Sequence, residues 1–364
     1  MSDAGFMHRA LHLAARAAGL TSPNPMVGAV IVRDATVVGE GFHTRAGAPH
    51  AEIEALRSAG ELARGGTLYV TLEPCVHQGR TPPCAPAVVA AGLARVVVAI
   101  TDPNPVVHGE GVAMLRRAGL EVEVGALAEE AGALNRAFFT RMREGRPHVT
   151  LKAGMTLDGK IADFEGTSRW ITGESARFEA HRLRSRSDGI VVGIETALKD
   201  DPELTVRLDP PWPQEPYRIV VDSHARLPCG ARLIKAGTPA RAVVAVVAGT
   251  GPERVGRLRK AGATVVECPG RKGRVDLCWL LQWLAARDVV SLLLEGGGEL
   301  NAAFLESGLV DRILLHVAPL ILGGRSSTGV VGGADRPLMG GVRLRGMEAR
   351  RLGDDLMIEA DVVR

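Results

Sequence analysis

Strands and helices alternate along the whole sequence, and this alternation limits the chain to layered α/β folds. Residues 27–32 read Val-Gly-Ala-Val-Ile-Val, a run typical of a strand, whereas residues 3–19 carry apolar side chains at helical spacing. The pattern continues with predicted strands at 36–42, 67–72, 95–100 and 121–124, and predicted helices at 51–59, 84–92, 110–118 and 127–143. Because such alternation packs a sheet against helical layers, we expect an α/β domain here.

The polar stretch Glu144-Gly145-Arg146-Pro147 separates this block from a second one. Proline disfavours helical backbone in the residue before it, so Pro147 ends the helix predicted at 127–143. We therefore divide the 364 residues into domains 1–145 and 146–364, each of ordinary domain size. The second block resumes with a strand at 148–153, and further apolar runs predict a second α/β domain: 189–194, 217–221, 241–247, 289–294 and 312–317.

Composition excludes several classes of protein. Hydrophobic residues make up 46% of the chain and charged residues 23%, which is too apolar for a disordered protein. Charges or glycines interrupt every stretch of about 18 residues, so we expect no membrane-spanning helix and no membrane partner. The chain opens Met1-Ser2-Asp3, unlike a secretory signal, and its 5 cysteines are sparse; we therefore expect a cytoplasmic protein with reduced thiols.

The strongest chemical motif combines one histidine, one glutamate and two cysteines. His50-Ala51-Glu52 stands at the start of a predicted helix, Pro74-Cys75 follows a predicted strand, and Cys84 comes nine positions later. One imidazole and two thiolates supply three zinc ligands, and a catalytic zinc keeps its fourth position open. A H-x-E motif followed by Pro-Cys is typical of zinc deaminases, in which the glutamate carries protons. We predict one zinc per chain on His50, Cys75 and Cys84, with Glu52 as the catalytic proton carrier.

Alternatives to this interpretation remain open. Eight residues, 76–83, separate the two cysteines instead of the usual two, so Cys84 reaches the metal only if Pro83 begins the next helix. His77 in that loop is a rival ligand. A purely structural zinc is disfavoured because such sites usually have four protein ligands. A deaminase that edits nucleic acid would need stacking aromatics, and only Phe6, Phe42 and Tyr69 precede residue 130, so we predict no nucleic-acid partner.

A glycine run dominates the second domain. Residues 292–300 read Leu-Leu-Leu-Glu-Gly-Gly-Gly-Glu-Leu, a strand whose final glycines, Gly296, Gly297 and Gly298, open a helix. Bare backbone N–H groups at a helix N-terminus suit a pyrophosphate. No G-x-G-x-x-G follows the first strand of this domain, so a Rossmann fingerprint is not indicated. Arg184, Arg207 and Arg226 supply fixed cations of the kind that bind phosphate groups.

Motifs along essentially the whole chain resemble the bifunctional riboflavin-biosynthesis deaminase–reductases. The loop between the cysteines is that family's own form. The departures are mild: Ala29, Gly154 and Thr156 replace more usual residues. The motifs that carry the resemblance are Ser22-Pro23-Asn24-Pro25-Met26-Val27-Gly28, Gly41-Phe42-His43, Glu73-Pro74-Cys75, Gly79-Arg80-Thr81-Pro82-Pro83-Cys84, Asp102-Pro103-Asn104-Pro105, residues 151–160, Trp170-Ile171-Thr172-Gly173 and Leu294-Glu295-Gly296-Gly297-Gly298.

The resemblance implies a cytidine-deaminase-like three-layer domain followed by a dihydrofolate-reductase-like α/β domain. It implies hydrolytic deamination of 2,5-diamino-6-ribosylamino-4(3H)-pyrimidinone 5′-phosphate, then NADPH-dependent reduction of the ribosyl group to ribityl. We also expect a homo-oligomer. Asn24, His43 and the turn at 102–105 would line the pyrimidine pocket. In the second domain the implied substrate residues are Lys152, Ser168, Arg184, Leu204, Arg207 and Glu295, and the implied NADPH residues, besides the glycine run, are Gly154, Trp170, Thr196, Asp200 and Ser223.

Overall fold

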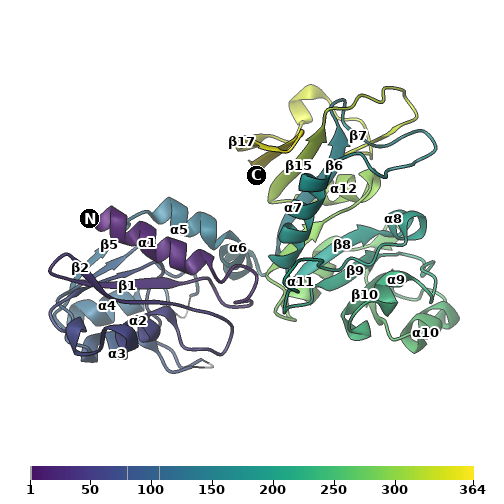
Figure 1. The fold of residues 1–364 in the computed structure, drawn as a ribbon. Coiled ribbons are helices and arrows are strands. Elements are labelled where there is room, and N and C mark those ends of the chain that lie inside the picture. Colours follow the sequence, from purple (N-terminus) through teal and green to yellow (C-terminus); the bar gives the residue numbers. More distant parts are fainter. Residues whose placement is uncertain (1, 80, 106) are drawn as a thin grey trace. The chain divides into compact units, whose positions relative to one another are not determined.

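The computed structural model describes residues 2–79, 81–105 and 107–364. The chain separates into two compact units, Met1–Arg146 and Pro147–Arg364 (Figure 1), and the predicted boundary after residue 145 adjoins this division. Within the described part of the chain, no helix is long and apolar enough to cross a membrane.

The N-terminal unit is a five-stranded sheet between two layers of helices. The strand order is β2-β1-β3-β4-β5; β1 is antiparallel to β2 and β3, whereas β3, β4 and β5 are parallel. Helices α2, α3 and α4 cover one face, and α1 and α5 cover the other (Figure 1). The elements are α1 (Asp3–Ala15), β1 (Gly28–Arg33), β2 (Thr36–Phe42), α2 (Ala51–Ala59), β3 (Thr67–Val70), α3 (Cys84–Ala90), β4 (Arg95–Val98), α4 (Glu110–Arg117), β5 (Glu121–Val124), α5 (Ala128–Leu134) and α6 (Arg136–Glu144).

Close helix-to-sheet packing fixes the layers of this unit. A Cβ at Gly28 would lie 2.0 Å from the Ala10 carbonyl oxygen, and one at Gly41 would lie 2.5 Å from that of Ala51. Only glycine therefore lets α1 and α2 approach β1 and β2 this closely. The second contact also holds the start of α2, directly after His50, against the sheet.

The helix predicted at 127–143 is wrong as a single element, because it breaks at Asn135 into α5 and α6. The backbone of Asn135 leaves helical geometry at φ −105° and ψ 20°. Its buried amide accepts from the backbone N–H of Met26 at 2.8 Å and donates to the Met26 carbonyl at 2.8 Å. These tertiary hydrogen bonds fix the loop that carries Asn24. The helix predicted at 3–19 is also shorter, since α1 ends at Ala15.

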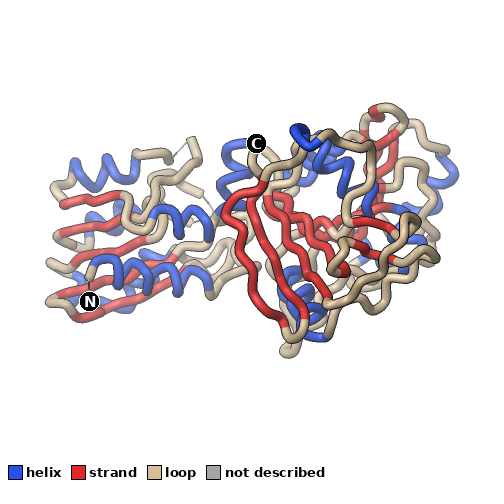
Figure 2. The backbone as a smooth tube through the Cα atoms, turned by 90° about the horizontal axis from the view of Figure 1, so that it is seen from above, coloured by secondary structure: helices blue, strands red, loops and turns tan. Residues whose placement is uncertain are grey.

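The C-terminal unit has a nine-stranded sheet of order β11-β10-β9-β8-β14-β6-β15-β18-β17 (Figure 2). Strands from β11 to β15 are parallel, and β18 and β17 extend the sheet antiparallel. Helices α11 and α12 pack on one face, and α8, α9 and α10 on the other. The main elements are β6 (His148–Thr156), α7 (Glu174–Ser185), β8 (Gly189–Gly193), α8 (Ile194–Asp200), β9 (Tyr217–Val221), α9 (Arg232–Lys235), β10 (Ala242–Val247), α10 (Pro252–Lys260), β11 (Thr264–Cys268), α11 (Leu277–Ala285), β14 (Ser291–Leu294), α12 (Gly298–Glu306), β15 (Arg312–Ala318), β17 (Leu344–Leu352) and β18 (Asp355–Val362).

Smaller elements complete this unit. Two short ladders pair outside the main sheet, β7 with β16 and β12 with β13. The β7–β16 ladder places β7, which follows β6, beside the segment that precedes β17. Their bounds are β7 (Lys160–Ala162), β12 (Gly270–Arg271), β13 (Arg274–Val275) and β16 (Thr328–Gly329).

Candidate active sites

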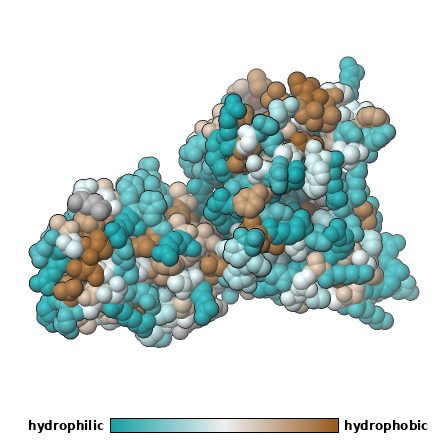
Figure 3. All heavy atoms as spheres, viewed as in Figure 1, coloured by the Kyte–Doolittle hydropathy of each residue, from teal (hydrophilic) through white to brown (hydrophobic). Residues whose placement is uncertain are grey.

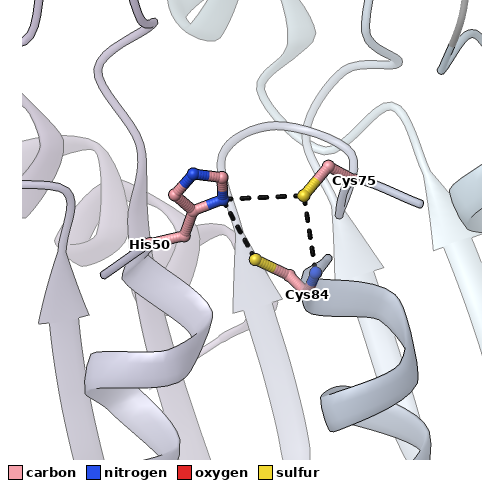
Figure 4. Close-up of side chains that lie close together, drawn as sticks. All are labelled: His50, Cys75 and Cys84. Atoms are coloured by element: carbon pink, nitrogen blue, oxygen red, sulfur yellow. Dashed lines mark hydrogen bonds between the residues drawn. The ribbon is translucent and has the colours of Figure 1, made fainter. Parts of the chain in front are cut away.

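Three predicted zinc ligands converge at one end of the N-terminal sheet (Figure 4). Nδ1 of His50 lies 3.1 Å from Sγ of Cys84 and 3.6 Å from Sγ of Cys75. His50 precedes the first residue of α2, Cys75 follows β3, and Cys84 is the first residue of α3. Pro83 stands just before α3, so the long loop after Cys75 ends with Cys84 facing the other two ligands.

The three donor atoms lie within 4.8 Å of one another, close to the spacing of a tetrahedral zinc site. With metal–ligand bonds of about 2.0–2.3 Å, neighbouring ligand atoms of a tetrahedron stand about 3.3–3.8 Å apart. The distance from His50 to Cys75 is within this range, and the distance from His50 to Cys84 is slightly shorter. Hydrogen bonding from Cys84 and His50 lowers the pKa of Cys75 to about 4, so a thiolate is ready for a metal. Across the described residues, the group of metal-ligating side chains has these three members, which leaves a fourth position for a reactant. His77, the rival ligand, is not a member.

Glu52 is buried beside the ligands, in the first turn of α2. Its Oε2 atom is enclosed without a hydrogen-bond partner among the described residues, and the side chain lines the same cavity as His50 and Cys75. Burial raises the pKa of Glu52 to about 7. A carboxyl group with such a pKa both accepts and returns a proton near neutral pH.

Thr81 is a functional candidate that the sequence did not reveal. A metal on Nδ1 of His50 leaves the ring hydrogen on Nε2, and Oγ1 of Thr81 lies 3.0 Å from Nε2. Such an acceptor fixes the tautomer and the orientation of a ligating imidazole. Thr81 lies in an irregular loop, where neither spacing nor apolar periodicity distinguishes it from its neighbours.

Asn24 and His43 lie together in a cavity of about 220 Å³ that also contains Glu52. The Pro49 carbonyl is 3.1 Å from Nδ1 of His43 and can only accept, so the ring hydrogen is on Nδ1. Nε2 then accepts from the amide nitrogen of Asn24 at 3.1 Å. Burial lowers the pKa of His43, which keeps the ring neutral. Asn24 therefore has its amide oxygen to offer to a donor on a ligand.

The turn after β4 also lines this cavity, through Asp102 and Asn104. Oδ1 of Asp102 accepts from the backbone N–H of Asn104 at 2.8 Å. Burial raises the pKa of Asp102 to about 6. The carboxyl group of Asp102 therefore changes its charge at mildly acidic pH.

The C-terminal unit has a cavity of about 570 Å³ at the start of α12. Gly297 and Gly298 lie in its wall, and Gly298 begins the helix. Neighbouring N–H groups at such a start favour an anion. Other predicted residues at this cavity are Ser168, Thr196, Asp200, Ser223 and Arg226; Lys199, Arg274 and Thr328 also line it and were not predicted.

A charged cluster lies near the centre of the long sheet. Nε and Nη2 of Arg184 donate to the two carboxylate oxygens of Glu295 at 3.0 and 2.6 Å, and Nη1 donates to the Thr205 carbonyl at 3.2 Å. Burial opposes ionisation of Glu295, but Arg184 outweighs it and lowers the pKa of Glu295 to about 2. Burial also lowers the pKa of Lys152. All three guanidinium nitrogens of Arg184 are engaged by the protein, and its contact with a substrate phosphate stays a prediction.

Several predicted residues lie away from the larger cavity. Leu204 is buried in the hydrophobic core with 2% of its surface exposed, so its side chain has no face for a ligand. Trp170 is exposed, and the guanidinium of Arg177 lies 4.7 Å from its ring centre. Gly154 and Gly296 do not line the cavity, and a Cβ at Gly154 would lie 3.2 Å from Cγ2 of Thr172. Arg207 is ion-paired with Glu203 at 2.9 Å.

Both units match known protein families. Residues 1–100 match the cytidine and deoxycytidylate deaminase zinc-binding region, and residues 147–358 match the RibD C-terminal domain. The riboflavin biosynthesis protein RibD of Aquifex aeolicus is 43% identical over 98% of this chain and 97% of its own. The RibD of Escherichia coli is 44% identical over 89% of each chain.

Solved structures agree with these relatives over the full length. Acinetobacter baumannii RibD has a TM-score of 0.90 at 38% identity and covers 100% of this chain and 99% of its own. A diaminohydroxyphosphoribosylaminopyrimidine deaminase/5-amino-6-(5-phosphoribosylamino)uracil reductase from Thermotoga maritima has a TM-score of 0.84 at 34% identity, with 99% of each chain covered.

Fold and site together define a bifunctional enzyme, a zinc-dependent deaminase followed by an NADPH-dependent reductase. The predicted order of the two fold types is confirmed. The chain belongs to the RibD family of riboflavin-biosynthesis proteins.

Replacement of Thr81 by valine should weaken zinc binding. Valine keeps the shape but cannot accept the His50 hydrogen bond, and loss of such a partner typically costs about 10–100-fold in metal affinity. Competition with a chromogenic chelator measures the effect. Thr36→Val, on the β1–β2 hairpin, is the matched control and should bind zinc like the wild type. Equal affinities for Thr81→Val and the control would remove Thr81 from the site.

Proposed function

We propose that this chain deaminates 2,5-diamino-6-ribosylamino-4(3H)-pyrimidinone 5′-phosphate in its N-terminal unit and reduces the ribosyl group of the product with NADPH in its C-terminal unit. The observation that carries the proposal is the convergence of His50, Cys75 and Cys84 beside the buried carboxyl group of Glu52. The Thermotoga maritima neighbour, a diaminohydroxyphosphoribosylaminopyrimidine deaminase/5-amino-6-(5-phosphoribosylamino)uracil reductase, couples the same two activities and supports this choice of substrate.

In the deamination, His50, Cys75 and Cys84 would hold the zinc. When bound, zinc supplies the Lewis acidity that makes water a nucleophile near neutral pH. Glu52 takes the proton from the attacking water and returns it to the leaving amino group, since its pKa of about 7 suits both transfers. The C–N bond to the amino group breaks, a C=O bond forms while the second proton of the water goes to the neighbouring ring nitrogen, and ammonia leaves. The amide oxygen of Asn24 accepts from an N–H of the pyrimidine and orients the ring.

The reductase uses NADPH as its hydride source, so the protein supplies position and charge. The N–H groups at Gly297 and Gly298 receive the pyrophosphate at the start of α12. Thr196, Asp200, Ser223 and Arg226 line the same cavity and would contact the rest of the cofactor. Ser168, which also lines this cavity, and the Lys152–Arg184–Glu295 cluster would contact the substrate. Lys152, whose pKa is lowered, would donate a proton as the sugar ring opens.

We also propose that the chain works in the cytoplasm as a homo-oligomer. The segment before β17, and β17 itself at the edge of the long sheet, expose apolar side chains: Leu338, Met339 and Met347 are 90%, 86% and 72% exposed. Apolar surface gathers at the upper end of the C-terminal unit (Figure 3). An exposed edge strand beside apolar surface favours a second copy of the same chain.

Glu52→Gln should abolish deamination and spare zinc. Glutamine keeps the shape of the side chain but cannot accept and return a proton, so the rate of ammonia release should fall by at least about 100-fold. Zinc content and NADPH oxidation with the deaminated substrate are the internal controls and should stay at wild-type levels. Ammonia release at the wild-type rate would contradict the assignment of Glu52.

Arg226→Ala should reduce the preference for NADPH over NADH. Arg226 lines the larger cavity, and Glu195 pairs with it, so a cofactor 2′-phosphate would compete with an exposed partner. Loss of one charge-assisted hydrogen bond of about 1.5–3 kcal/mol should raise the KM for NADPH about tenfold or more and leave that for NADH unchanged. Arg254→Ala, which lies outside this cavity, is the matched control. An unchanged ratio of the two KM values would remove Arg226 from the cofactor site.

The mass of the native protein tests the oligomer. Light scattering should give a multiple of the chain mass of 38.4 kDa, and Met339→Glu/Met347→Glu should shift it toward the single chain. Leu62→Glu, an exposed position in the N-terminal unit, is the control. A wild-type mass of one chain would overturn the oligomer, and an oligomeric double variant would exclude this surface.

A further inference from the structure

Glu73 connects the zinc-ligand segment to the turn that carries Asp102 and Asn104. It is buried with 3% of its surface exposed and stands two residues before Cys75. Its Oε2 accepts from the backbone N–H groups of Asp102 at 3.1 Å and Gly109 at 3.0 Å. Oε1 accepts from the N–H of Val112 at 3.0 Å. The side chain of Glu73 therefore binds the loop after β4 at Asp102 and at Gly109, and also binds the first turn of α4 at Val112.

The charge of Glu73 is balanced by backbone groups. None of the ion pairs found among the described residues includes this carboxylate. Gly109 precedes α4 and supplies no capping side chain, and Val112 is in the first helical turn. An anion at this end of a helix satisfies N–H groups that have no partner within the helix and meets the positive end of its dipole. Glu73 thus caps α4 from a distant point in the sequence.

A steric contact locks the same two segments together. A Cβ at Gly111 would lie 2.1 Å from the carbonyl oxygen of Pro74 and 3.0 Å from Cγ of Glu73. The start of α4 therefore lies directly on the residue that precedes Cys75, and a side chain at position 111 would separate them. This contact is independent of the hydrogen bonds and acts at the same place.

The loop held in this way forms one wall of the cavity that contains Glu52. Asp102 and Asn104 lie on that wall, and His50 and Cys75 lie on the metal side. The ring of His108 adds a hydrogen bond from Nδ1 to the Asp102 carbonyl at 3.0 Å. Residues 73–75 therefore connect the metal side of the cavity with the Asp102–Asn104 turn.

We propose that Glu73 is a positioning residue of the deaminase, which holds the Asp102–Asn104 turn at the correct distance from the zinc site and so determines the affinity for the pyrimidine. It acts through the turn, since its two oxygens are occupied by three N–H groups. The inference rests on the proposed function, because the turn matters only if a pyrimidine binds in this cavity.

Glu73→Gln in the full-length, zinc-loaded enzyme tests the proposal. The amide keeps one acceptor oxygen but places an NH₂ group against backbone N–H groups, so the turn should shift. The KM for the diaminopyrimidine ribotide should rise at least about tenfold, with a smaller change in kcat. Zinc should stay at one ion per chain, and NADPH oxidation with the deaminated substrate should be unchanged. Glu110→Gln, an exposed carboxylate in the first turn of α4, is the matched control.

Two further variants separate positioning from a general loss of structure. Gly111→Ala should reproduce the rise in KM, because its Cβ displaces α4 while Glu73 is intact. In an Asp102→Ala/Asn104→Ala background, Glu73→Gln should change KM less than about twofold, since residues that act as a unit are not additive.

Three results would overturn the proposal: an unchanged KM in Glu73→Gln, loss of zinc in that variant, or a full additional effect in the background without the turn side chains. A wild-type enzyme that releases no ammonia from the ribotide would instead refute the proposed function.

Discussion

The zinc-ligand site depends on one feature of the N-terminal sheet: the carboxyl ends of parallel strands lie beside the N-termini of helices. His50 and Cys84 stand at the starts of α2 and α3, Cys75 follows β3, and Asp102 follows β4. Helix N-termini carry partial positive charge, which stabilises thiolates and carboxylates. The same arrangement buries Glu52, and this burial raises the pKa of its carboxyl group to about 7. Metal binding, proton transfer and substrate recognition therefore share one electrostatic environment.

Sequence patterns predicted most of the fold because buried strands and amphipathic helices leave strong periodic signals. The bounds of α2, β5 and β9 agree with the predictions at both ends. The hairpin of β17 and β18 was not predicted, since β17 is an exposed edge strand with three arginines and one glutamate and shows no apolar alternation. The break between α5 and α6 could not be predicted either, because its cause is the pairing of Asn135 with a residue more than one hundred positions away.

The candidate sites also contain residues that the sequence predicted and residues that it did not. The zinc ligands and Glu52 were predictable because metal chemistry restricts residue type and spacing so strongly. Thr81 and Glu73 were not, because each acts through a hydrogen bond that only the folded chain brings together. In the C-terminal unit, Thr196, Asp200 and Ser223 lie around one cavity, whereas Leu204 is in the core. Arg184 shows why charge alone is a weak guide: the carboxylate of Glu295 already neutralises it.

Among the described residues, those that line the first cavity lie between 23 and 138 and those that line the second lie between 161 and 332, so each set belongs to one unit. The two cavities therefore share no described lining residue. The presence of both sites in one chain has a consequence for the cell. A single translation event yields one copy of each site, so the capacities of the two steps stay in a fixed stoichiometry at every level of expression.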